Sequence, residues 1–139
     1  MKTCSVIVAV MVLGLVVPAQ LRAAPGAAPA KVPPELFKAK VDAARRTYDV
    51  IWKNNREGLI PLAELAYRWS RRWMEAELEL SDKKDDQVAA YQAHKSRMRE
   101  LARITRERYR NRVNTVEETT ATEFYIAEAD VWLEQAKNK

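Results

Sequence analysis

Apolar residues recur along the chain at spacings of three and four in successive stretches, a pattern typical of helices that bury one face. In the first predicted helix, from about Glu35 to Glu57, the apolar positions are Phe37, Val41, Ala44, Tyr48 and Ile51. In the second, from Pro61 to about Leu80, they are Ala66, Trp69, Trp73, Ala76 and Leu80. Both stripes follow the rhythm of a coiled coil or helical bundle.

The second half of the chain predicts two more helices. A polar break from Ser81 to Asp86 starts the third, which runs to about Arg112, and its apolar positions are Val88, Tyr91, Met98, Leu101 and Ile104. The fourth begins after Thr115, and its stripe is Phe124, Ala127, Val131 and Leu133, with Trp132 beside them. This last stripe is the least regular.

Short connections make consecutive helices antiparallel neighbours, so the sequence predicts an all-α fold of two antiparallel helical hairpins. One arrangement is an up-down-up-down bundle, and the other is a pair of extended coiled-coil hairpins that bury their stripes against further copies of the chain. In either arrangement we expect a set of aromatic residues in the core: Tyr48, Trp52, Trp69, Trp73, Phe124 and Trp132.

The two hairpins, Arg45–Leu80 and Arg99–Leu133, also read as an internal repeat. Their turns align without a gap, since Gly58 lies over Arg112 and Pro61 over Thr115. Proline suits the first turn of a helix, and Thr115 with Glu118 predicts a capping box. Gly58 favours a left-handed helix end, which Arg112 does not. Chance similarity between helices rich in Ala, Glu and Arg is the alternative explanation.

The N-terminal residues predict export rather than fold. Lys2 precedes an apolar run from Val6 to Val17, and small residues follow at Ala23 and Ala24. We therefore expect a signal peptide over residues 1–24, a Pro/Ala-rich disordered linker over 25–34 and a helical hairpin-repeat domain over 35–139. A retained N-terminal anchor is the alternative. Cleavage would remove Cys4, leaving a periplasmic or secreted protein without cysteine and without a transmembrane segment.

Charge adds one candidate interaction surface. Removal of Lys2 and Arg22 lowers the formal net charge from +5 to +3, which is too small to indicate a nucleic-acid partner. In an antiparallel bundle, basic residues from the ends of the first and third helices would meet in a basic pole: Lys53, Arg56, Arg103, Arg106, Arg108, Arg110 and Arg112. This pole would suit an acidic protein or anionic lipid and polysaccharide headgroups. Alternatively, these arginines complement the helix dipole.

The sequence predicts no enzyme and no catalytic, cofactor or metal site. A single histidine, His94, excludes zinc sites built on several His or Cys ligands, and we expect it on the surface or along a helix seam. The segment Tyr67–Trp73 mixes arginine with aromatic residues, as some nucleic-acid and membrane-binding segments do. Because Trp69 and Trp73 continue the apolar stripe, we expect them to point inward.

The turns Arg56–Pro61 and Arg110–Thr115, each between an Arg-rich helix and a helix with an early Glu, carry a family resemblance. Residues Arg45–Leu133 resemble the periplasmic helical hairpins of the TolC-like outer-membrane efflux family. With the Trp-rich segment Tyr67–Trp73, they also resemble uncharacterised secreted bacterial helical-hairpin proteins. The efflux family implies a helical tunnel of several subunits below a membrane β-barrel. Because this chain lacks strands for a barrel, the resemblance implies only the hairpin.

Together these observations favour a non-enzymatic secreted or periplasmic helical interaction module of the cell envelope, which associates with itself or with an envelope protein. Two alternatives stay open. A small apolar-ligand carrier would hold its ligand beside Trp69, Trp73 and Trp132. An envelope chaperone or stress sensor would be similar to small helical periplasmic chaperones, although their Leu-Thr-x-x-Gln repeats are missing here.

Overall fold

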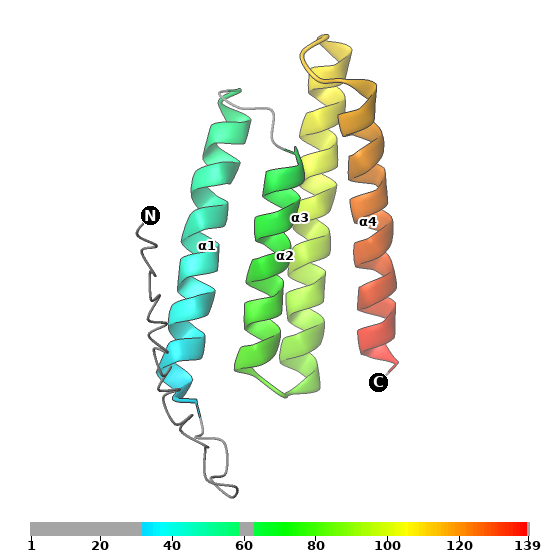
Figure 1. Ribbon diagram of the computed structural model, residues 1–139. Coiled ribbons are helices and arrows are strands. Elements are labelled where there is room, and N and C mark those ends of the chain that lie inside the picture. The colour runs from blue at the N-terminus through cyan, green and yellow to red at the C-terminus, as the bar shows by residue number, and fades with distance from the viewer. Residues whose placement is uncertain (1–31, 59–62, 139) are drawn as a thin grey trace, which may run out of the picture. The chain divides into compact units, whose positions relative to one another are not determined.

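The computed structural model describes residues 32–58 and 63–138, which form four α-helices (Figure 1). These helices confirm the predicted all-α class, and their bounds are α1 Pro34–Arg56, α2 Ala63–Leu80, α3 Lys84–Arg110 and α4 Val116–Lys137. The predicted signal peptide, the linker up to residue 31 and Pro61 lie outside the described residues. The other end of the predicted linker is helical, because α1 already starts at Pro34, where the missing proline N–H has no intrahelical partner to lose.

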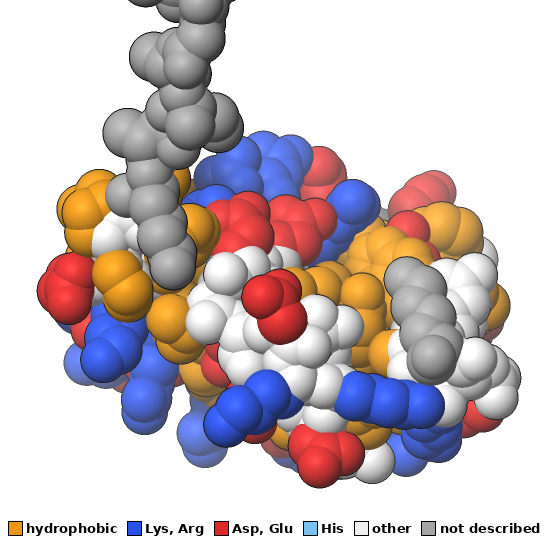
Figure 2. Space-filling view, turned by 90° about the horizontal axis from the view of Figure 1, so that it is seen from below, with side chains coloured by type: hydrophobic (Ala, Val, Ile, Leu, Met, Phe, Trp, Pro, Cys, Tyr) orange, Lys and Arg blue, Asp and Glu red, His pale blue; other side chains and the backbone are white. Residues whose placement is uncertain are grey.

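Consecutive helices run antiparallel, and α1 and α4 lie at opposite edges with α2 and α3 between them (Figure 1). The close pairs are α1–α2, α2–α3 and α3–α4, with a smaller contact between α2 and α4. The helices are therefore not closed into a square bundle, which would pack α1 along α4, and the hairpins are not separate. Figure 2 looks along the helices and shows hydrophobic side chains at the surface on both edges.

The turns at the ends of α1 and α3 have the same backbone conformation. Gly58 has φ +74° and Arg112 has φ +60°, both in the left-handed region. At each turn the preceding residue donates its N–H to the carbonyl four residues back, and Gly58 or Arg112 donates to the carbonyl three back. The expectation for Gly58 is confirmed, and the second turn adopts the same conformation without glycine.

The start of α4 also agrees with the sequence. The Glu118 N–H donates to Thr115 Oγ1 at 3.3 Å, and the Thr115 N–H donates to Glu118 Oε2 at 3.2 Å. This is the predicted capping box, which satisfies two backbone donors that the helix itself cannot pair.

The core is built largely from small residues. Ala63, Ala66, Met98, Leu101 and Ala129 form a buried cluster that joins α2, α3 and α4. Larger side chains pack around it from outside: Ile51, Trp52, Tyr67, Tyr125 and Ile126. Alanine at the contacts lets the helices approach closely, while the aromatic residues fill the space toward the margins.

Most of the predicted core aromatics do pack inward. Tyr48 is buried, stacks on Trp52 at 5.9 Å between ring centroids and contacts Trp73 at 5.8 Å. Trp69 is half-buried beneath the guanidinium of Arg72, which lies 4.7 Å from its ring. Trp52, Trp73 and Trp132 are half-buried as well.

Phe124 is the exception, and its assignment to the core is wrong because 62% of its surface is exposed. The inward face of α4 is formed instead by Thr122, Ala129, Leu133 and Ala136. Phe124 comes two residues after Thr122, which places it on the other side of the helix. Ala127 and Val131, predicted on the same stripe, are exposed too. The sequence of α4 is apolar on two faces, and the predicted stripe mixed them, because Leu133 belongs to the buried face and Phe124, Ala127 and Val131 to the exposed one.

Candidate interaction surfaces

The outward face of α4 carries a largely apolar stripe interrupted by one threonine. Its members follow one another at spacings of four, four, three and four residues: Val116, Thr120, Phe124, Ala127 and Val131. All are exposed, and the three large apolar side chains, Val116, Phe124 and Val131, keep 55%, 62% and 54% of their surface. We call this set the outer stripe. A helix that is apolar on two opposite faces is normally covered on both, whereas α4 is covered by α3 and α2 on one.

Acidic residues border the outer stripe on both sides. Toward α3, Asp130 pairs with Lys95, and the Glu123 carboxylate lies 3.8 Å from the Arg106 guanidinium. Toward α2, Glu128 accepts a hydrogen bond from the Tyr67 hydroxyl. These contacts hold the acids at the margins of the stripe and leave its apolar centre open.

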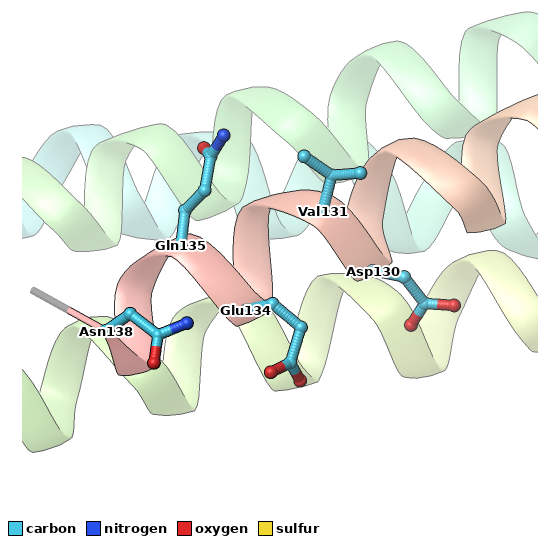
Figure 3. Close-up of a pocket in the computed structure, with 5 residues that line it drawn as sticks. All are labelled: Asp130, Val131, Glu134, Gln135 and Asn138. Carbon is cyan, nitrogen blue, oxygen red and sulfur yellow. The ribbon is translucent and has the colours of Figure 1, made fainter.

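The outer stripe continues into a shallow depression near the C-terminal end of α4 (Figure 3). Its lining comes from this helix: Asp130, Val131, Glu134, Gln135 and Asn138. The side chains of Val131 and Gln135 stand on one side of the helix axis in this view, and those of Asp130 and Glu134 on the other. The depression therefore extends the outer stripe by about two turns and adds polar groups to it.

The predicted basic pole is brought together at one end of the unit. Arg108 links α3 to the end of α1, because its Nη1 donates to Asn55 Oδ1 at 3.1 Å and its Nη2 donates to the Asn55 carbonyl. Arg108 is half-buried in this contact, so it acts as a clamp between helices. Lys53, Arg56, Arg110 and Arg112 are exposed at the same end.

Much of the positive charge at this pole is paired within the unit. Arg103 donates to Glu107 at 2.6 Å and to Glu100 at 2.7 Å, and the hydrogen bond to Glu100 lowers the pKa of that carboxyl. Lys53 lies 4.0 Å from Glu57. The pole is therefore a mixed charged surface, with less capacity for a polyanion than its arginine content indicates.

A buried polar centre lies between α2 and α3. Ser70 and His94 are both fully buried, and Ser70 Oγ is 2.8 Å from His94 Nδ1. Arg97 Nε donates to the same Oγ at 2.7 Å, and the Arg97 guanidinium lies 4.0 Å from the Trp73 ring. Because arginine can only donate, Ser70 Oγ accepts from Arg97, and its remaining lone pair and proton allow it to accept from or donate to Nδ1 according to the tautomer of the imidazole.

Burial shifts the titration of two groups here. Burial, with the positive charge of Arg97 as the second cause, lowers the pKa of His94 from 6.5 to about 4. Burial raises the pKa of Glu77, against the opposing effect of Arg97. His94 Nε2 has no hydrogen-bond partner among the described residues, and its ring is flanked by Tyr67 and Trp132. His94 is thus a fully buried seam residue, and the centre holds helices together instead of presenting Ser70 to a substrate.

The space in which a carrier would hold its ligand is occupied by side chains. Tyr48 and Arg97 pack against Trp73, and His94 and Arg71 pack against Trp132. The groove beside Trp69 opens at the surface and is lined largely by charged residues of α1 and α2.

Within residues 32–58 and 63–138, no group of His, Cys, Asp and Glu is arranged to hold a metal ion. Over the same residues, every helix is too short or too polar to cross a membrane.

Comparison of the chain with protein-family models, curated proteins and solved structures finds no match. The outer stripe and its acidic margins are consequently the features on which a function can be argued.

Sequence reasoning missed the outer stripe and the polar centre for different reasons. Phe124, Ala127 and Val131 were recognised as a stripe but assigned to the core, whereas Val116 and Thr120 were not included, and the polar side chain of Thr120 in register with them was the available signal. His94 and Arg97 follow Ser70 by 24 and 27 residues along the chain, so nothing local in the sequence links them to Ser70.

Proposed function

We propose that this protein is a non-enzymatic, exported helical interaction module of the cell envelope. It works by helix-to-helix docking, with the outer stripe of α4 as the contact surface. The observation that carries the proposal is the exposure of Val116, Phe124 and Val131 along one face of a helix whose opposite face is packed. Burying such a stripe against a partner releases free energy of about 25 cal/mol for each Å² of apolar surface.

The packing inside the unit supports a scaffold role for the other helices. The Ser70–His94–Arg97 centre ties α2 to α3, and Arg108 ties α3 to α1. Two further links, Lys95 with Asp130 and Tyr67 with Glu128, fix the orientation of α4. A rigidly held helix presents its stripe to a partner at a lower entropic cost than a free helix would.

The predicted export signal and the resemblance to periplasmic efflux hairpins support a location outside the cytoplasm for this activity. A hairpin that docks onto other helices is the shared property. The helical tunnel is not included in the proposal.

In-cell photo-cross-linking tests the proposed function. A photo-reactive residue at Thr120, in the middle of the outer stripe, should give an adduct with another protein. The same residue at Gln92, exposed on α3 and away from the stripe, serves as the matched control and should not. The Thr120 adduct should also disappear when Phe124→Ser is added. Absence of an adduct from position 120, or equal adducts from 92 and 120, would contradict the proposal.

A further inference from the structure

We infer that the outer stripe docks an amphipathic helix of a different protein, one whose apolar stripe is flanked by lysine or arginine, and does not pair with a second copy of this chain. The inference rests on the proposed function and adds the chemistry of the partner.

The charge around the outer stripe carries this inference. Helix α4 has six acidic residues and one basic residue, Lys137. When the bases that neighbouring helices place beside it are included, Lys84, Lys95 and Arg106 of α3 and Arg71 of α2, acids outnumber bases by six to five. Glu123 and Asp130 border the stripe on one side and Glu128 on the other, while Glu117 and Glu134 lie near its ends. A helix laid along the stripe therefore meets negative charge along both flanks, which favours basic flanking residues in the partner.

The same charges disfavour pairing of α4 with its own copy. In a symmetric pair of α4 helices, the acidic margins of one copy would lie against the acidic margins of the other. Like charges at flanking positions select against such pairs in coiled coils.

The outer edge of α1 fits no better. Leu36, Ala43 and Val50 are exposed there, and Glu35, Asp42 and Asp49 precede them one by one at the same seven-residue interval, although α1 as a whole also carries six basic residues. A second copy that docked its α1 onto α4 would bring both signs of charge to the acidic margins, whereas a helix with bases on both flanks brings only complementary charge.

An anionic membrane surface is disfavoured for the same reason. Helices that lie on such surfaces carry Lys and Arg beside their apolar face. The outer stripe has Glu and Asp at those positions. Of the surfaces that could cover the stripe, a basic amphipathic helix has the complementary charge.

The dimensions of the stripe also suit a helix. From Val116 to Val131 it spans 15 residues of α4, which is about 22 Å of helix axis. Its four spacings cover these 15 residues, an average of 3.75, which is closer to the 3.6 residues of a helical turn than to the 3.5 of a seven-residue repeat, so a nearly straight partner helix of about 20 residues can lie along it.

Two synthetic helical peptides of about 20 residues test the inference. They share one stripe of Leu and Ile and differ only in flanking residues, Lys in one and Glu in the other. The purified full-length protein should bind the Lys-flanked peptide at least about tenfold more tightly than the Glu-flanked peptide. This preference should shrink as salt is raised, because the flanking charges are exposed.

Charge reversal supplies matched variants. Glu123→Lys with Glu134→Lys changes two exposed acids of α4 and should invert the preference between the two peptides. Asp42→Lys with Asp82→Lys makes the same change in net charge at exposed positions outside α4, and it should leave the preference unchanged. Phe124→Ser should weaken binding of the Lys-flanked peptide about tenfold or more.

Several results would overturn the inference: equal binding of the two peptides, binding of neither, or a control variant that inverts the preference. A concentration-dependent dimer in light scattering that is lost in Phe124→Ser would also overturn it, because the stripe would then pair with a second copy. Failure of the peptides together with a Thr120 adduct to another protein in cells would remove this inference and leave the proposed function standing. Absence of both would remove the two together.

Discussion

In most proteins polar side chains are exposed and large apolar side chains are buried. The centre of the unit and the outer face of α4 both show the reverse. Ser70 and His94 are fully buried between helices, while Phe124 keeps 62% of its surface exposed. In the centre, Arg97 donates to Ser70 and Ser70 contacts His94, while His94 Nε2 has no partner among the described residues. The outer face has apolar groups that nothing among the described residues covers.

This contrast separates residues that hold the unit together from residues that are free to serve binding. A buried hydrogen-bonded network makes packing specific, because any shift leaves a polar group without a partner. An exposed apolar residue adds little to folding, and its retention on one face of a helix favours a role in contact with another molecule. Substitutions in the two regions should therefore separate stability from association.

The largest effect is expected for Arg97→Ala, which breaks the centre. It removes the hydrogen bond to Ser70 and the packing on Trp73, and it leaves the half-buried Glu77 without the guanidinium that opposes its raised pKa. We expect a loss on the order of 3 kcal/mol in the free energy of unfolding. Denaturant titration measures it, with Arg99→Ala on the exposed side of α3 as the control, expected to change stability by less than about 0.5 kcal/mol. Equal effects of the two variants would show that the centre has no special weight.

Acidification should break the centre next. Because the folded pKa of His94 is about 4 and the unfolded value is 6.5, the folded protein binds this proton less readily. Its contribution to stability is complete above pH 6.5 and is lost as pH falls toward 4. At about 1.4 kcal/mol for each pKa unit, the loss is on the order of 3 kcal/mol. Thermal unfolding between pH 6.5 and 5, where few carboxylates titrate, isolates the effect.

Two variants sharpen the acid prediction. His94→Gln should flatten the loss between pH 6.5 and 5, because the amide does not titrate. Glu77 acts with the opposite sign, since its raised folded pKa stabilises the folded state as pH falls. Glu77→Gln should therefore make the acid loss steeper, and a shallower profile would contradict the assignment.

The buried faces of α1, α2 and α3 and the start of α4 could be predicted from the sequence. The stripes of α1, α2 and α3 each had one apolar face, so Tyr48, Met98 and Leu101 were assigned to the core, where they are buried. Thr115 and Glu118 marked the start of α4 through local backbone chemistry. Periodicity and capping depend on residues a few positions apart, which is why they are visible in the sequence.

The orientation of α4 and the buried polar centre could not be predicted in the same way. Helix α4 has two apolar faces, and periodicity alone does not tell which one meets α3. The buried face consists of small residues such as Ala129 and Ala136, because the helices approach closely, while the larger Phe124 and Val131 lie outside. The pairing of Ser70 with His94 depends on how α2 and α3 are aligned, and that alignment is a property of the tertiary packing.

The turn before α4 offers a smaller effect of the opposite sign. Arg112 has φ +60°, which costs a non-glycine residue about 1–2 kcal/mol. Arg112→Gly should relieve this strain and, after the added flexibility of glycine in the unfolded chain, raise the free energy of unfolding by about 0.5–1 kcal/mol. Gly58→Ala is the mirror experiment and should lower it. An added Cβ at Gly58 meets only Arg108 Nη2 at 3.9 Å, so the cost is conformational. Stabilisation by both substitutions, measured by chemical denaturation, would contradict the equivalence of the two turns.

The smallest effect on stability is expected for Phe124→Ser, on the outer face. The side chain is 62% exposed, so its removal should change the free energy of unfolding by no more than about 0.5 kcal/mol. Leu101→Ala, at a fully buried apolar position, should cost about 2–5 kcal/mol in the same measurement. If Phe124→Ser instead destabilised the purified monomer as much as Leu101→Ala does, the outer stripe would be part of the folded core and not a surface. If Phe124→Ser leaves stability unchanged and the Thr120 adduct in cells is lost, the outer stripe contributes to the free energy of binding and not to that of folding, because its apolar surface is buried only in the complex.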